Sequence, residues 1–106
     1  MELSYLVYFR TVAKTEHISQ AAAELHITQP ALSRAIGRVE QEVGAQLFER
    51  GANSIRLNHT GRAFLLRVEQ ILAEYDDAMR EASDNSQVET GSVKLMAPTL
   101  ELLTGF

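Results

Sequence analysis

Residues 19–43 constrain the fold more than any other part of the chain, because they predict two helices that meet at a very short turn. The alanine-rich stretch "QAAAEL" ends near His26, and a second helical pattern begins only a few residues later. Two helices that cross steeply over such a turn need small or apolar residues where they face the core. The residues at these points are Ala21, Ala22, Leu25, Ile27, Leu32 and Ala35. The pattern favours a helix-turn-helix motif that reads DNA, and an ordinary pair of packed helices is the alternative.

Pro30 marks the start of the second helix and not a break in it. Thr28 is a good N-cap residue, and Pro30 then falls in the first turn, where its missing N–H has no intrahelical partner to lose. Gly44 is the expected C-terminal stop. The expected buried stripe of this helix comprises Leu32, Ile36, Val39 and Val43.

The flanking segments predict two more helices and a hairpin. Apolar residues at helical spacing indicate a helix over residues 2–14, and Ser19 is the expected N-cap of the helix that contains "QAAAEL". The segments "QLFER" and "SIRLN" flank a three-residue turn, "GAN", which predicts a short β-hairpin. Asn58 or Thr60 is expected to cap a long helix over residues 59–84. The expected fold is therefore mainly α.

The second helix of the motif carries a polar face opposite its apolar stripe. This face consists of Gln29, Ser33, Arg34, Gly37 and Arg38. Gln can bind adenine through two hydrogen bonds, Arg can bind guanine or phosphate, and Ser can contact either, so the face suits the major groove of DNA. A solvated surface is the simpler explanation. However, no acidic residue occurs between Gln29 and Val39, whereas an indifferent surface usually mixes both signs of charge.

The net charge of −4 argues against a nucleic-acid partner only until its distribution is considered. Through Arg67 there are eight basic and six acidic residues, whereas from Val68 onward there are two basic and eight acidic residues. The two parts are therefore expected to do different jobs, unless the division is ordinary surface variation.

The stretch 17–65, "HISQAAAELHITQPALSRAIGRVEQEVGAQLFERGANSIRLNHTGRAFL", resembles the amino-terminal domain of the LysR-type transcriptional regulators. The similarity extends from Met1 to about Met96, and the joint occurrence of "AAAELHITQPALSR", "LFER" and "RLNHTG" is specific. The resemblance implies a mainly α winged helix-turn-helix with a two-stranded β wing, followed by a long linker (dimerisation) helix. It also implies a regulator that binds double-stranded DNA sequence-specifically, as a homodimer or higher homo-oligomer on a roughly palindromic site.

The family's recognition-helix pattern matches this chain residue by residue. The resemblance implies that Gln29 and Pro30 meet base edges or sugar, and that Ser33 and Arg34 contact phosphate and base. Arg50 matches the wing arginine that reaches the flanking minor groove or backbone. The full expected DNA-binding set is Ser19, Thr28, Gln29, Pro30, Ser33, Arg34, Arg38, Arg50 and Arg56. The chain departs from the family at Asn53, where many members have a second basic wing residue, so its grip on the minor groove is expected to be weaker.

The last helix carries apolar residues that alternate steps of four and three. These are Gly61, Leu65, Val68, Leu72, Tyr75, Met79 and Ala82. About three heptads exceed what so small a domain could cover, so the seam favours a dimer. The expected interface residues are Leu65, Val68, Leu72, Tyr75 and Met79. Packing of this stripe on its own domain is the alternative.

The expected division of the chain follows from these features. Residues 1–58 form the winged helix-turn-helix, 59–84 the linker helix, 85–91 a hinge, and 92–106 the start of an effector-binding domain. "VKLMAP" in the last segment is expected to form a short strand. The resemblance places Thr99 where some relatives touch their inducer, so a small-molecule inducer is expected for the full-length protein.

Other classes of function lack their signals. The chain has no cysteine, its three histidines lack metal-site spacing, and no phosphate-binding glycine loop or nucleophile elbow occurs, so no metal, cofactor or enzymatic activity is expected. No run approaches the roughly 18 apolar residues of a membrane span, and the expected location is the cytoplasm. The rival interpretations are a helical interaction module that binds no DNA, and the DNA-binding part of a recombinase-type enzyme.

Overall fold

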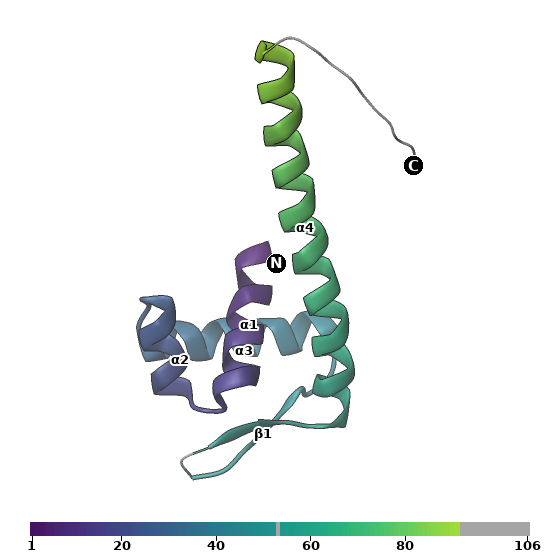
Figure 1. The fold of residues 1–106 in the computed structure, drawn as a ribbon. Coiled ribbons are helices and arrows are strands. Elements are labelled where there is room, and N and C mark those ends of the chain that lie inside the picture. Colours follow the sequence, from purple (N-terminus) through teal and green to yellow (C-terminus); the bar gives the residue numbers. More distant parts are fainter. Residues whose placement is uncertain (53, 92–106) are drawn as a thin grey trace. The chain divides into compact units, whose positions relative to one another are not determined.

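The computed structural model describes residues 1–52 and 54–91, with side chains through residue 86. Its elements are α1 (Leu3–Thr15), α2 (Ile18–Leu25), α3 (Gln29–Val43), β1 (Phe48–Arg50), β2 (Ile55–Leu57) and α4 (His59–Gly91) (Figure 1). The two strands pair antiparallel, with Phe48 opposite Leu57 and Arg50 opposite Ile55. The predicted mainly α fold with a two-stranded hairpin is confirmed.

The chain forms two compact units, of which the first is Met1–Leu72 and the second begins at Ala73. The first unit contains α1, α2, α3, the hairpin and the first turns of α4. It extends beyond residue 58 because Val68 and Leu72 of α4 are buried in the same core as α1. The beginning of α4 is therefore part of the first folding unit.

The core of the first unit is centred on Phe9 of α1. Its ring centroid lies 5.4 Å from that of Phe48 in the hairpin and 5.1 Å from that of Phe64 in α4, in tilted and edge-on arrangements that aromatic rings prefer. Helix α3 contributes Leu32, Ile36 and Val39, which are fully buried. This packing fixes which face of α3 remains outside.

The end of α3 differs in one residue from the predicted stripe. Val43 is 39% exposed, so its assignment to the buried stripe was wrong. The helix ends directly after it, at Gly44, whose φ of 81° lies in the left-handed region that glycine adopts without strain. Gly44 is thus the predicted stop.

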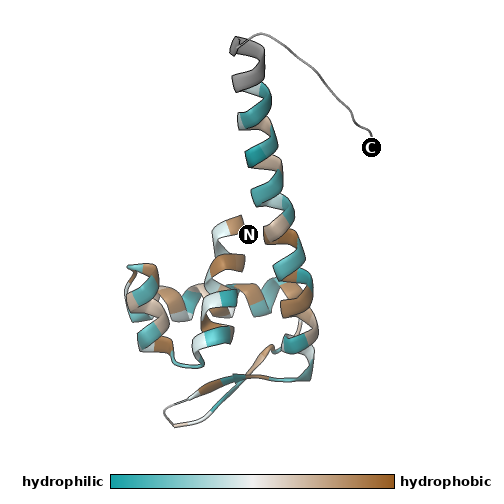
Figure 2. Ribbon diagram, in the orientation of Figure 1, coloured by the Kyte–Doolittle hydropathy of each residue, from teal (hydrophilic) through white to brown (hydrophobic). Residues whose placement is uncertain are grey.

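The predicted seam of α4 divides into two parts. Gly61, Val68 and Leu72 are buried, and Leu65 is half-buried against the same core. These four positions therefore pack within their own domain, the alternative that the heptad pattern left open. Met79 and Tyr75, in the second unit, are exposed. Figure 2 shows that the later turns of α4, up to the residues drawn in grey, are mainly hydrophilic.

Helix α4 is longer than predicted. It continues to Gly91 and includes residues 85–91, for which a hinge was expected. The polar stretch there contains no proline, so its composition is also compatible with an exposed helix. The expected strand "VKLMAP" and Thr99 lie outside the described residues. None of the helices in the described part of the chain is long and apolar enough to cross a membrane.

Candidate nucleic-acid interface

Thr28 and Pro30 build the first turn of α3 as predicted. The Thr28 hydroxyl oxygen accepts the N–H of Ala31 at 3.2 Å, and the Thr28 carbonyl accepts the N–H of Leu32 at 3.0 Å. Pro30 lies in this turn, where no N–H is needed. Both Gln29 and Pro30 are consequently exposed at the amino-terminal end of α3.

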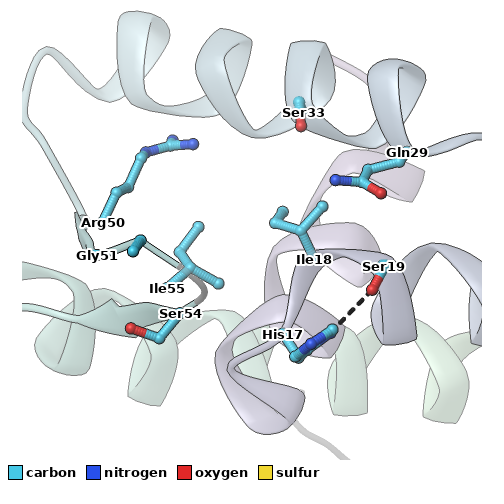
Figure 3. Close-up of a pocket in the computed structure, with 10 residues that line it drawn as sticks. His17, Ile18, Ser19, Gln29, Ser33, Arg50, Gly51, Ser54 and Ile55 are labelled. Atoms are coloured by element: carbon cyan, nitrogen blue, oxygen red, sulfur yellow. Dashed lines mark hydrogen bonds between the residues drawn. The ribbon is translucent and has the colours of Figure 1, made fainter.

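The start of α2 corrects the predicted cap. His17, not Ser19, is the N-cap residue: its Nδ1 accepts the N–H of Gln20 at 3.3 Å. Ser19 lies within the first turn, and its hydroxyl is 3.0 Å from the same ring nitrogen (Figure 3). A histidine Nδ1 is as close to the backbone as the side-chain oxygen of asparagine, which explains why it can cap. The sequence did contain a signal for this cap, because His17 precedes Gln20 by three residues, the spacing at which a side chain can accept a backbone N–H of the first turn.

The turn between α2 and α3 is made by His26. Its φ of 59° is left-handed, a conformation that costs a non-glycine residue about 1 kcal/mol or more. Two hydrogen bonds hold the turn: the N–H of His26 reaches the carbonyl of Ala23 at 3.2 Å, and the N–H of Ile27 reaches that of Ala22 at 3.1 Å. Ile27 also packs against the core. His26 is therefore a turn residue, as its position in the sequence predicted.

The outer face of α3 presents the residues expected from its periodicity. Gln29, Pro30 and Arg34 are exposed, and Ser33 is half-buried. Within the described residues, Arg34 makes no ion pair or side-chain hydrogen bond. Its guanidinium is thus available for an external acceptor.

Arg38 lies on the same face but is already engaged. Its Nε donates to Glu42 Oε2 at 2.7 Å, one helical turn further along. This hydrogen bond holds the pKa of the Glu42 carboxyl below its usual value. Arg38 can reach another partner only by sharing or leaving Glu42, which makes it a weaker candidate than Arg34.

The hairpin carries the two other candidate arginines. Arg50 ends β1, and its Nη2 lies 3.2 Å from Glu40 Oε1 of α3, so the expected wing arginine is also part of an ion pair. Arg56 is exposed on β2, directly opposite Glu49 in the register. An acidic neighbour of each arginine, Glu40 in an ion pair and Glu49 across the strands, moderates the positive charge of the hairpin.

A concave pocket of about 290 Å³ joins several of these residues. It is lined by His17, Ile18, Ser19, Gln29, Ser33, Arg50, Gly51, Ala52, Ser54 and Ile55. Figure 3 shows the Arg50 side chain extending from the hairpin toward the helix that carries Ser33. Among the described residues that line the pocket, none is acidic. The structure therefore brings the starts of α2 and α3 together with the hairpin into one surface that suits an anionic ligand.

The predicted site residues occupy different places relative to this surface. Ser19, Gln29, Ser33 and Arg50 line the pocket, and Arg34 lies on the neighbouring exposed face of α3. Thr28, Pro30, Arg38 and Arg56 do not line the pocket. His17 also lines the pocket, although the sequence did not predict it as a site residue. In the described part of the chain no group of three or more His, Cys, Asp or Glu side chains could hold a metal ion.

The sequence matches a known family over most of the first unit. The family described as "Bacterial regulatory helix-turn-helix protein, lysR family" matches residues 3–62. The chain is 43% identical to the uncharacterized HTH-type transcriptional regulator YybE of Bacillus subtilis over 95 residues. The matched region covers 90% of this chain and 32% of that protein. It is 36% identical over 109 residues to the HTH-type transcriptional regulator TfdT of Cupriavidus pinatubonensis, over 100% of the chain and 48% of that protein.

Solved structures with the same fold include complexes with DNA. The CbnR DNA-binding domain bound to DNA superposes with a TM-score of 0.78 at 31% identity, over 81% of this chain and 99% of that one. The DarR protein of Vibrio fischeri, in complex with DNA, gives a TM-score of 0.78 at 34% identity, over 83% of this chain and 30% of that one. The chain thus spans about a third to a half of the length of the curated relatives described above.

Proposed function

Because the chain belongs to the LysR family of bacterial regulatory helix-turn-helix proteins, we propose that it binds double-stranded DNA sequence-specifically and regulates transcription. The observation that carries this proposal is the exposed face of α3. Its residues include Gln29 and Arg34, whose side chains can read base edges in a major groove, and the pocket beside it joins Ser33 to Arg50 of the hairpin. The hairpin would act as the wing.

The proposed contacts divide by chemistry. Gln29 and Arg34 are suited to base edges, and Ser33 with Arg50 to phosphate oxygens. The start of α2 adds Ser19 to the same surface, together with the amide groups of a helix amino terminus, which favour anions. The solved relatives in complex with DNA support this docking over an interaction module without DNA. A role as a regulator, and not as an enzyme, follows the relatives' descriptions.

Selection of duplexes from a random DNA pool tests the proposal. The chain is expected to enrich one half-site sequence, which then serves as the probe in fluorescence anisotropy against a scrambled duplex. Equal affinity for the selected and scrambled duplexes at moderate salt would contradict sequence-specific binding.

Arg34→Ala is expected to weaken binding to the selected duplex by about 1 to 3 kcal/mol, or roughly fivefold to 150-fold. The reason is that Arg34 is the exposed arginine of α3 without an internal partner among the described residues. Anisotropy titrations measure the change. Arg80→Ala is the matched control, because it removes the same charge from an exposed arginine that pairs with Asp77. A similar loss in both variants would mean that only overall charge matters.

We also propose that the chain pairs with a second copy through α4. The support is the exposure of Tyr75 and Met79, which are large apolar side chains four residues apart on one helix. The family resemblance implies such a linker helix and a small-molecule inducer for the whole protein. We propose that the protein acts in the cytoplasm, where it would reach DNA. A dimer would present two recognition helices to a roughly palindromic site.

Met79→Glu is expected to weaken dimerisation at least about tenfold, because it places a charge in the proposed apolar contact. Met79 is 57% exposed in the single chain, so the fold itself should tolerate the change. Sedimentation velocity measures the association. Gln70→Glu introduces the same group at another exposed position of α4 and should leave dimerisation intact. Unchanged sedimentation of the Met79 variant would exclude Met79 from the interface.

A further inference from the structure

One carboxylate connects the recognition helix to the wing. Glu40 lies in the last turns of α3, and its Oε2 accepts the N–H of Leu47 at 2.7 Å and the N–H of Phe48 at 3.2 Å. Its Oε1 pairs with Nη2 of Arg50 at 3.2 Å. Three donors from the segment that becomes β1 thus converge on one side chain of α3.

The two backbone hydrogen bonds to Glu40 are partly shielded from water, whereas its pair with Arg50 is exposed. The Glu40 side chain is only 16% exposed, and Leu47 and Phe48 are fully buried. Hydrogen bonds to an ionised acceptor are roughly twice as strong as those between neutral groups, and the protein interior strengthens them further. The first strand of the wing is therefore held to α3 directly, and not only through the short connection after Gly44.

The pairing leaves Arg50 partly free. One of its nitrogens contacts Glu40, while a guanidinium carries five N–H donors and the side chain is 43% exposed. Its position is defined, because Arg50 lines the same pocket as Gln29 and Ser33. Its charge is also partly compensated, so it should bind an isolated phosphate more weakly than a free arginine would.

We propose that Glu40 is a positioning residue for DNA recognition. It holds Arg50 and the wing at a fixed place relative to Gln29 and Ser33, and it limits the attraction of Arg50 for phosphates at any other place. The residue thereby lowers binding to random DNA and raises the ratio of specific to non-specific affinity. This inference rests on the proposed function.

Glu40→Gln in the full chain tests it, because glutamine can still accept the N–H groups of Leu47 and Phe48 but no longer compensates Arg50. Affinity for a scrambled duplex at low salt is expected to rise about three- to tenfold, and the ratio of specific to non-specific affinity to fall about tenfold. The slope of log affinity against log salt concentration for the scrambled duplex should become steeper by about 1, because one more phosphate contact is made. A merely structural role would not steepen this slope.

Two controls separate the causes. Glu24→Gln removes one negative charge from an exposed position of α2, and it should leave the affinity ratio near that of the unchanged chain. The double variant Glu40→Gln/Arg50→Gln should lose the additional slope, since the released arginine is absent. An unchanged slope in Glu40→Gln, or the same rise in Glu24→Gln, would overturn the inference.

Arg50→Lys provides a second test that leaves Glu40 intact, should thermal unfolding show that Glu40→Gln is not folded. Lysine keeps the charge but lacks the planar fork, so the salt slope should persist while the specificity ratio falls several-fold. A retained ratio would overturn the inference. If the unchanged chain prefers the selected duplex and Glu40→Gln has the same affinity ratio and salt slope as the unchanged chain, only the role of Glu40 fails. If the unchanged chain shows no sequence preference, the proposed function fails and the inference falls with it.

Discussion

Gly61→Ala is expected to lower the free energy of unfolding by about 3 kcal/mol, because the first turn of α4 leaves no room for a methyl group. A Cβ at this position would overlap the carbonyl oxygen of Leu47 and would lie 2.8 Å from Cδ2 of Leu57. The backbone of Leu47 cannot easily move away. Its carbonyl accepts the N–H of Asn58 at 2.9 Å, and its own N–H is bound by Glu40 at 2.7 Å. Urea unfolding followed by circular dichroism measures the loss.

Gly37→Ala is the matched control for this prediction. It makes the same substitution inside α3, where a Cβ would meet nothing within 4 Å. Alanine is favoured over glycine in a helix interior by about 1 kcal/mol, so this variant should be slightly more stable than the unchanged chain. Opposite signs at the two positions would show that close packing, and not helix propensity, requires Gly61. A gain in stability at both positions would contradict the argument.

The local features of the fold could be predicted because their causes lie within a few residues. The cap of α4 is one example: Asn58 Oδ1 accepts the N–H of Gly61 at 2.7 Å, as one of the two predicted capping residues. The cap at Thr28 and the stop at Gly44 have the same origin. Such motifs depend on residue type and short spacing, which a single sequence contains.

The predicted N-cap of α2 was wrong because the prediction compared the average capping preferences of residue types and not the geometry of the chain. Ser19 is a better average N-cap than His17, but the chain enters α2 from Glu16 in the left-handed conformation, with φ of 56°. This exit from α1 places the His17 ring over the amide of Gln20. Where one helix ends thus decided where the next began.

The electrostatics of the interface were only partly visible in the sequence. The Arg38–Glu42 pair has helical i,i+4 spacing and could have been predicted from it, but Glu42 lies beyond the interval from Gln29 to Val39 in which no acidic residue occurs. The Arg50–Glu40 pair joins α3 to the hairpin over ten residues of sequence. It depends on how the hairpin folds back on the helix, which no local pattern specifies. An exposed arginine is therefore not always an unpaired one, as Arg38 and Arg50 show.

The heptad pattern of α4 gives a period but not the surface that it covers. Val68 and Leu72 pack against the domain's own core, and Glu69 between them lies 3.0 Å from Lys14 and 3.9 Å from Arg10 of α1. An intramolecular and an intermolecular helix contact need the same spacing of apolar residues. Only the position of α1 decides between them, and that position results from the whole fold.

Leu72→Glu is consequently expected to destabilise the fold, by about 3 kcal/mol or more, and not simply to separate two chains. Leu72 is 4% exposed, and a carboxylate there would be buried without a designed partner. Thermal unfolding and urea titration measure the loss. Ile71→Glu is the matched control, because Ile71 is the neighbour of Leu72 on the same helix but is 45% exposed. This substitution should cost less than about 1 kcal/mol of stability.

The dependence of the loss on protein concentration decides which role Leu72 has. If Leu72 serves the core of its own domain, the free energy lost on substitution is the same at low and high concentration, because the substitution does not change the association of two chains. If it serves mainly a contact between chains, raising the concentration restores stability by mass action. We expect the first result for Leu72→Glu. A loss that disappears at high concentration would return Leu72 to the dimer interface that its heptad position predicts.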